Sequence, residues 1–188
     1  MNVIARWVSI LGHPFVLTAV LVVGVALRLA GPREALRSLL LVGLIALLPL
    51  AILMRRQVRR GAWDHVDASH RAERPVLFAV GILSLAVLLV IALVVRPGDF
   101  LIRGSLGALI LLAVCAVATR WIKVSLHMVF GTLATTILLL LRSPAGWGLL
   151  VALPVLAWSR LALKRHTAGE VALGFVLGAA FGYAICSL

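Results

Sequence analysis

The residues best suited to chemistry lie near the C-terminus of the sequence. His166 and Glu170 are four residues apart, so on a helix the carboxylate can lie beside the imidazole. A carboxylate that holds one ring nitrogen fixes the tautomer and leaves the other nitrogen to act as nucleophile or base. Gly174, Gly178 and Gly182 continue the same face as a ridge of small residues, which favours close helix packing. The alternative is a glycine-rich packing helix with a hydrogen-bonded histidine at its end.

Two other clusters carry the residue types of phosphoryl transfer. One is the segment 123–127, with Lys123, Ser125 and His127, and the other is the loop 63–75, which contains Arg71 and Arg74. Arginine presents a rigid fork of donors to phosphate oxygens, and two histidines allow one to attack while the other donates a proton. The acidic residues are too scattered for a Mg²⁺ site, so we expect neither a metal nor a cofactor.

The elements that must position these residues are apolar. Of 188 residues, 63% are hydrophobic and 13% are charged, against about 45–50% and about 25% in soluble domains. A mean hydropathy of +1.17 excludes a water-soluble fold. The net charge is +12, and the basic residues lie between the apolar runs. In that position they are better explained by membrane orientation and by binding to anionic headgroups than by binding to nucleic acid.

The pattern predicts an all-α integral membrane protein, a bundle of six or seven transmembrane helices with the site at one membrane face. We expect residues 1–188 to form a single membrane-embedded domain. The count would be six if one of the apolar runs were re-entrant or if the first run lay partly in the membrane interface. In that first run, His13-Pro14 favours a proline-kinked helix with an interfacial histidine. The candidate spans are 7–30, 36–54, 75–95, 101–119, 124–141, 145–163 and 168–188.

The basic residues predict the orientation. With seven spans, the 18 lysines and arginines divide twelve to six, and the richer side carries all three polar clusters. The positive-inside rule assigns that side to the cytoplasm. We therefore expect a multi-pass protein of a bacterial inner membrane whose site faces the cytoplasm.

The three clusters together resemble a known family. Ser159-Arg160-x5-His166-x3-Glu170 resembles the third signature of the type 2 phosphatidic acid phosphatase superfamily, S-R-x5-H-x3-D. Ser125-Leu126-His127 is similar to the second signature, P-S-G-H, and Arg74-Pro75 to the end of the first, K-x6-R-P. The pattern Asp67-x3-Arg71-x2-Arg74 resembles a divergent bacterial branch of the superfamily.

This resemblance implies roles for individual residues. His166 would be the nucleophile that forms a phosphohistidine, with Glu170 orienting it and His127 as the acid for the leaving alcohol. Arg74, Arg160 and Ser125 would bind the phosphate oxygens. Asp67 stands at the position of the family lysine, and Arg71 and Lys123 would substitute for that lysine. Glutamate replaces the aspartate of the third signature, and two apolar spans separate Pro75 from Lys123. The implied substrate is a lipid or polyprenyl phosphate, monoester or diphosphate.

Two alternatives stay open. Asp64-x2-Asp67 before Arg74-Pro75 also resembles an aspartate-rich motif of Mg-dependent membrane prenyltransferases, which would need a second acidic cluster. The other is a non-enzymatic protein, a small transporter or a scaffold that binds anionic lipid, in which polar residues would line a path across the membrane. The expected partners are the substrate and membrane lipids, with no nucleic acid; the sequence does not set an oligomeric state.

Overall fold

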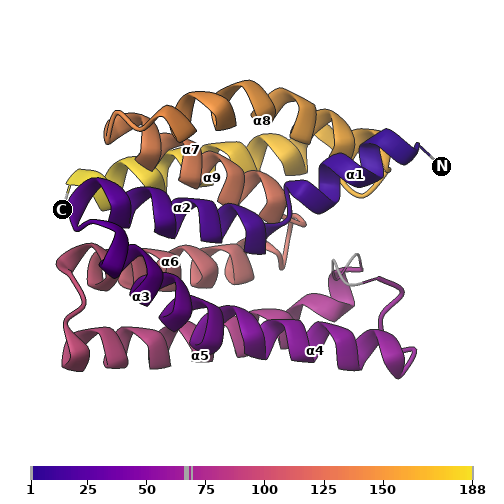
Figure 1. Ribbon diagram of the computed structural model, residues 1–188. Helices are drawn as coiled ribbons and strands as arrows, with labels where there is room; N and C mark the ends of the chain where they lie inside the picture. The colour runs from indigo at the N-terminus through magenta and orange to yellow at the C-terminus, as the bar shows by residue number, and fades with distance from the viewer. Residues whose placement is uncertain (1, 66–67, 69, 188) are drawn as a thin grey trace. The chain divides into compact units, whose positions relative to one another are not determined.

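The computed structural model describes residues 2–65, 68 and 70–187, and over these residues the chain is helical and contains no strand (Figure 1). The chain divides into two compact units. Unit 1 joins the two ends of the chain, Met1–Ala35 and Ile122–Leu188, and unit 2 is the stretch between them, Leu36–Trp121. The prediction of an all-α protein is therefore confirmed for the described residues.

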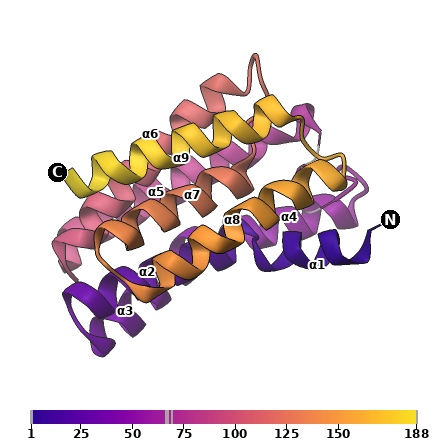
Figure 2. The same ribbon diagram turned by 90° about the horizontal axis from the view of Figure 1, so that it is seen from above.

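Unit 1 is built around one central helix. Helix α7 (Leu126–Leu140) packs against α2 (Pro14–Leu29), α8 (Pro144–Ala162) and α9 (Ala168–Ser187), and the short helix α1 (Val3–Leu11) packs against α8. Figure 2 shows these helices running side by side. The contacts also set their directions: His13 lies beside His127, and Gly24 lies against Leu138, so α2 and α7 are parallel.

The glycine ridge of α9 packs on α7, as the sequence predicts. A Cβ atom on Gly174 would lie 2.7 Å from the Ser125 carbonyl oxygen, and one on Gly178 would meet the Val129 carbonyl oxygen. One on Gly182 would lie 2.8 Å from the Thr136 Cβ atom. Because the contacts advance along both helices together, α9 runs parallel to α7 and their N-termini lie at the same end.

The first predicted span is broken. Helix α1 ends at Leu11 and α2 begins at Pro14, with a bend of 40° between them. Proline provides no amide hydrogen and suits the first position of a helix, so the chain starts a new helix here. The side chain of Leu156 from α8 fills the space beside Gly12. The break therefore places residues 12 and 13 against the C-terminal half of α8.

Unit 2 contains a helical hairpin and a kinked long helix. The hairpin is α5 (Arg74–Val95) and α6 (Asp99–Ala118), and a short 3₁₀ turn (Arg71–Glu73) precedes α5. The long helix consists of α3 (Pro32–Val42), a π-helical turn (Gly43–Leu47) and α4 (Leu48–Arg59). Pro49 lies two residues after the π turn, and the loss of its amide donor explains the irregular turn. Both the π turn and α4 pack against α5.

Among the residues that the structure describes, five helical segments are long and apolar enough to cross a membrane, or six if the bent pair α1 and α2 forms one span. Each of the seven predicted runs falls on helix, and the first run falls on two helices, α1 and α2. Helix α7 has only 15 residues, and the second run extends past its predicted end at 54, because Arg55 to Arg59 continue α4. The five segments are Pro32–Arg59, Arg71–Val95, Asp99–Ala118, Pro144–Ala162 and Ala168–Ser187.

Tryptophans mark both ends of unit 1. Trp7 on α1 and Trp158 near the end of α8 are exposed, and so is Trp147 near the start of α8. Aromatic side chains of this kind collect at the two interfaces of a bilayer. Their placement, together with the long apolar helices, is that of a multi-pass membrane protein.

Candidate functional site

Five helix ends meet at one end of unit 1, and they carry most of the predicted site residues. The starts of α2, α7 and α9 lie there with the ends of α1 and α8 (Figures 1 and 2). Parallel packing of α2, α7 and α9, with α8 antiparallel to them, brings these ends together. The predicted residues gathered at this end are Lys123, Ser125, His127, Arg160, His166 and Glu170.

His166 and Glu170 form a buried pair. The Nδ1 atom of His166 lies 2.8 Å from the Oε2 atom of Glu170, and the two side chains are 3% and 16% exposed. When the ring is neutral, Nδ1–H donates to the carboxylate, so the lone pair lies on Nε2. This is the geometry that the i, i+4 spacing predicts.

Glu170 has a second structural task that the sequence analysis missed. The backbone N–H of Thr167 donates to Glu170 Oε2 at 3.2 Å, and the N–H of Glu170 donates to Thr167 Oγ1 at 3.3 Å. This reciprocal pair is a capping box at the start of α9, and its signal in the sequence is Thr167-x-x-Glu170. One carboxylate therefore both caps the helix and holds His166, and the two tasks explain why a glutamate suits this position.

Ser125 joins the start of α7 to the start of α9. Its backbone N–H donates to the carbonyl oxygen of Glu170 at 3.3 Å. Its side chain is fully buried, and within the described ranges the hydroxyl has no hydrogen-bond partner. His127 follows on the first turn of α7 and is 4% exposed. Through this contact α7 and α9 hold the two predicted catalytic histidines at one end of the unit.

Arg160 is buried in the last turn of α8, with 2% of its side chain exposed. Its guanidinium donates to the hydroxyl oxygen of Ser9 from α1. Ser9 is a site residue that sequence reasoning missed, since a single serine in an apolar run carries no distinctive signal. The contact fixes one edge of the guanidinium and connects the first helix of the chain to the site.

Lys123 holds the loop between α8 and α9. Its ammonium group donates to the carbonyl oxygen of Arg165 at 2.7 Å, and the N–H of Arg165 donates to the carbonyl oxygen of Arg160 at 3.1 Å. These contacts fix the loop that presents His166. The predicted phosphate-binding role of Lys123 stays a prediction.

His13 also belongs to this end, at the break between α1 and α2. Its ring centroid lies 5.5 Å from that of His127, and the two rings are nearly perpendicular. The sequence analysis interpreted His13-Pro14 as a kink with an interfacial histidine. The kink is present, and the histidine lies next to the predicted catalytic acid.

The electrostatics of this end suit an anion. The N-terminus of a helix carries partial positive charge and exposed amide donors, and three helices begin here. Arg160, Lys123, Lys164 and Arg165 add full positive charges, against one carboxylate, Glu170. A phosphate group matches this balance, because its oxygens accept hydrogen bonds and carry negative charge.

Unit 2 contains the remaining predicted residues. The guanidinium of Arg71 donates through Nε to the carbonyl oxygen of Thr119 at 2.6 Å, which ties the start of α5 to the end of α6. Arg74 is 2% exposed on the first turn of α5. Asp67 lies outside the described residues. The sequence analysis placed both arginines in the loop 63–75, whereas Arg71 begins the 3₁₀ turn and Arg74 begins α5.

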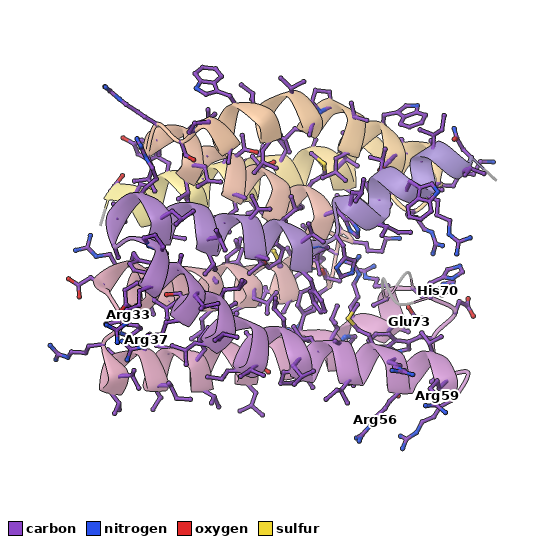
Figure 3. The ribbon with its side chains drawn as sticks, viewed as in Figure 1. Arg33, Arg37, Arg56, Arg59, His70 and Glu73 are labelled. Carbon is purple, nitrogen blue, oxygen red and sulfur yellow. The ribbon has the colours of Figure 1, made fainter. Side chains whose placement is uncertain are left out.

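One end of unit 2 is strongly polar. Figure 3 shows Arg56 and Arg59 of α4 at the same end as His70 and Glu73. His70 Nε2 lies 2.7 Å from Asp64 Oδ2, and both side chains are mostly exposed. Among the residues that the structure describes, no three histidine, cysteine or acidic side chains are grouped as metal ligands would be.

Comparisons of the chain with protein-family models, with curated proteins and with solved structures found no match.

Proposed function

We propose that the protein is a membrane phosphatase that hydrolyses lipid or polyprenyl phosphates through a phosphohistidine intermediate, without a metal. The observation that carries the proposal is the buried His166–Glu170 pair, at an end of unit 1 that also holds His127, Arg160 and Ser125. The resemblance of the three motifs to the type 2 phosphatidic acid phosphatases supports the same chemistry.

The first step forms one bond and breaks one. His166 Nε2 attacks the phosphorus atom, and the bond from phosphorus to the lipid oxygen breaks. His127 donates a proton to that oxygen, so the lipid leaves as an alcohol. Glu170 stabilises the positive charge that the ring of His166 gains, because its carboxylate accepts the Nδ1–H.

The second step returns the enzyme to its starting state. His127, now neutral, takes a proton from water, whose oxygen attacks the phosphorus atom and releases His166. The products are inorganic phosphate and the lipid alcohol. Arg160 and Ser125 are proposed to bind the phosphate oxygens in both steps. The phosphate-binding roles of Arg74 and Arg71 stay what the motif resemblance implies.

The substrate is proposed to be a lipid because the site lies at the ends of long apolar helices. A tail could remain in the bilayer while the phosphate enters the polar end of unit 1. The chain has only eleven residues between the end of α4 at Arg59 and the 3₁₀ turn that begins at Arg71, too few to form a separate domain that recognises a large polar substrate.

Phosphate release from a panel of lipid phosphates tests the proposal. Purified wild-type protein in detergent with EDTA is expected to release phosphate, and His166→Ala to release none. His70→Ala is the matched control, because His70 also pairs with a carboxylate but on an exposed surface. Activity that EDTA removes and Mg²⁺ restores would favour the prenyltransferase-like alternative, and activity unchanged by His166→Ala would remove the proposed nucleophile.

We further propose that the site faces the cytoplasm of a bacterial inner membrane, from the distribution of basic residues. A single cysteine at the exposed position Ala62, in a chain with Cys115→Ser and Cys186→Ser, reports the side of that loop. An impermeant thiol reagent is expected to label Ala62→Cys only after the cells are opened. Labelling in intact cells would reverse the orientation.

A further inference from the structure

We infer that His13 is a positioning residue for His127, holding the imidazole of the proposed leaving-group acid in place and tuning its proton affinity. The inference rests on the proposed function for the identity of the reaction, but the pairing of the two rings rests on the structure alone. No motif of the sequence includes His13, which lies more than a hundred residues from His127 in the chain.

The ring of His13 is held on two sides. Its Nδ1 accepts the backbone N–H of Phe15 at 3.2 Å, which makes His13 the N-cap of α2. The Phe15 ring lies edge-on at a centroid distance of 4.8 Å. Because Nδ1 is the acceptor, the neutral ring must carry its proton on Nε2. The position and the tautomer of this imidazole are therefore both fixed by local structure.

The other side of the fixed ring is occupied by His127. The centroids are 5.5 Å apart at an interplanar angle of 86°, an edge-to-face arrangement. His127 is buried in the first turn of α7. An N-cap needs only a small polar side chain, and serine, threonine, asparagine and aspartate are preferred there. A histidine in this position therefore provides more than the cap requires.

A second imidazole changes the proton chemistry of the first. Two nearby rings in a buried site resist carrying charge at the same time, so a proton on His127 disfavours a proton on His13. The other ionisable groups at this end are Arg160 of α8, Glu170 of α9 and, in the adjoining loops, Lys123, Lys164, Arg165 and His166. The start of α2 brings the imidazole of His13 beside His127.

The variant His13→Asn removes the imidazole ring and keeps the N-cap, so it separates the effects of the two. Asparagine keeps an oxygen acceptor for the Phe15 N–H, so α2 should start as before, and an unchanged thermal midpoint checks this. We expect kcat to fall about tenfold, KM to change less than about twofold, and the pH at which kcat declines to move by about half a unit or more. Phe15→Leu is the control, since it removes the aromatic neighbour and keeps both imidazoles. If His13→Asn unfolds, His13→Ser takes its place.

A double variant tests whether His13 acts through His127. In a His127→Ala background, His13→Asn should produce no further loss of kcat, because the ring it positions is gone. An equal loss in both backgrounds, or a kcat and pH profile that His13→Asn leaves unchanged, would overturn the inference.

A measurement without substrate separates this inference from the proposed function. Side-chain NMR of histidines in detergent-solubilised protein follows the titration of His127, assigned with His127→Gln. His13→Asn should shift that titration midpoint, and Phe15→Leu should not. If His13→Asn shifts the titration midpoint but the wild-type protein hydrolyses no lipid phosphate, the pairing of the two rings is upheld and the phosphatase proposal is refuted. If the wild-type protein is active but His13→Asn causes no shift, the phosphatase proposal is upheld and the pairing is refuted.

Discussion

The two units each contain a histidine paired with a carboxylate beside a helix start, and the pairs differ mainly in burial. His166 and Glu170 are 2.8 Å apart and 3% and 16% exposed, whereas His70 and Asp64 are 2.7 Å apart and 65% and 69% exposed. Both helix starts carry a capping box, Thr167 with Glu170 and His70 with Glu73.

The difference shows that distance alone does not define a site. Water screens an exposed ion pair and leaves it worth little, while a buried pair keeps a fixed geometry and a strong interaction. Each pair lies at an end of its unit that also holds a buried arginine, Arg160 in unit 1 and Arg74 in unit 2, and the pair in unit 1 has in addition the buried histidine His127 at its end. The pair in unit 1 is therefore suited to catalysis, and the pair in unit 2 to capping a surface turn.

Replacing the two histidines should give the largest contrast. His166→Ala removes the proposed nucleophile and should lower the rate of phosphate release by at least about 10⁴-fold, since deletion of a nucleophile can cost about 10⁶-fold in kcat. His70→Ala should leave the rate within about twofold of wild type, because an exposed ion pair contributes little. Steady-state kinetics on one lipid phosphate measure both, and equal losses would end the distinction between the pairs.

Removing the two carboxylate charges should give the next largest contrast. Glu170→Gln keeps an acceptor for the capping box but loses the charge that stabilises the His166 imidazolium, so kcat should fall about 100-fold. Asp64→Asn is the matched change at the exposed pair and should alter neither kcat nor the thermal midpoint. Rapid-quench detection of the phosphorylated protein gives a second readout, since Glu170→Gln should slow its formation. A fully active Glu170→Gln would leave the carboxylate with only its capping task.

Arginine replacement distinguishes a buried fork from a surface charge. Arg160→Lys keeps the charge and loses the planar fork, so kcat/KM should fall about 30-fold, corresponding to about 2 kcal/mol for a lost charged hydrogen bond. Arg59→Lys, on the exposed end of α4, should have no effect. Ser9→Ala should lie between them, because it frees the guanidinium without removing it. An active Arg160→Lys would indicate that charge alone is required.

Thr167→Ala should give the smallest effect. It deletes the hydroxyl that accepts the Glu170 N–H and should lower the free energy of unfolding by about 1 kcal/mol. Because Glu170 Oε2 keeps its bond to the Thr167 N–H, kcat should fall no more than about threefold. Thermal unfolding in detergent measures the first quantity. A loss of activity as large as that of Glu170→Gln would mean that the cap, rather than the charge, positions His166.

The sequence predicted the helices better than the connections between them. Apolar runs located the helices, because burying a helix in a bilayer demands about 20 apolar residues whatever its neighbours are. Among the described residues, five of the helical segments, or six with the bent pair α1 and α2, are long and apolar enough to cross a membrane. The helix break at His13 could be predicted from Pro14. The continuation of α4 to Arg59 could not, because charged residues usually mark the end of a membrane span. The i, i+4 spacing predicted the contact of His166 with Glu170, because that contact is local.

Contacts between distant segments were the ones that the sequence could not predict. Ser9 reaches Arg160, and His13 reaches His127, across more than a hundred residues in each case. Such pairs depend on how α1 and α2 pack on α7 and α8, and a single serine or histidine has no periodic pattern to reveal its partner. The glycine ridge was predictable because it repeats every four residues on one face.

The division of unit 1 between the two ends of the chain has a consequence for synthesis of the protein. Helices α1 and α2 are made before unit 2, whereas their partners α7 and α8 are made after it. Unit 2 is continuous and can assemble before the rest of unit 1 is translated. Helices α1 and α2 must therefore wait in the membrane without their partners. The proposed active site forms only after α9 has been made, so a nascent chain that stops before α9 cannot act on the lipids around it.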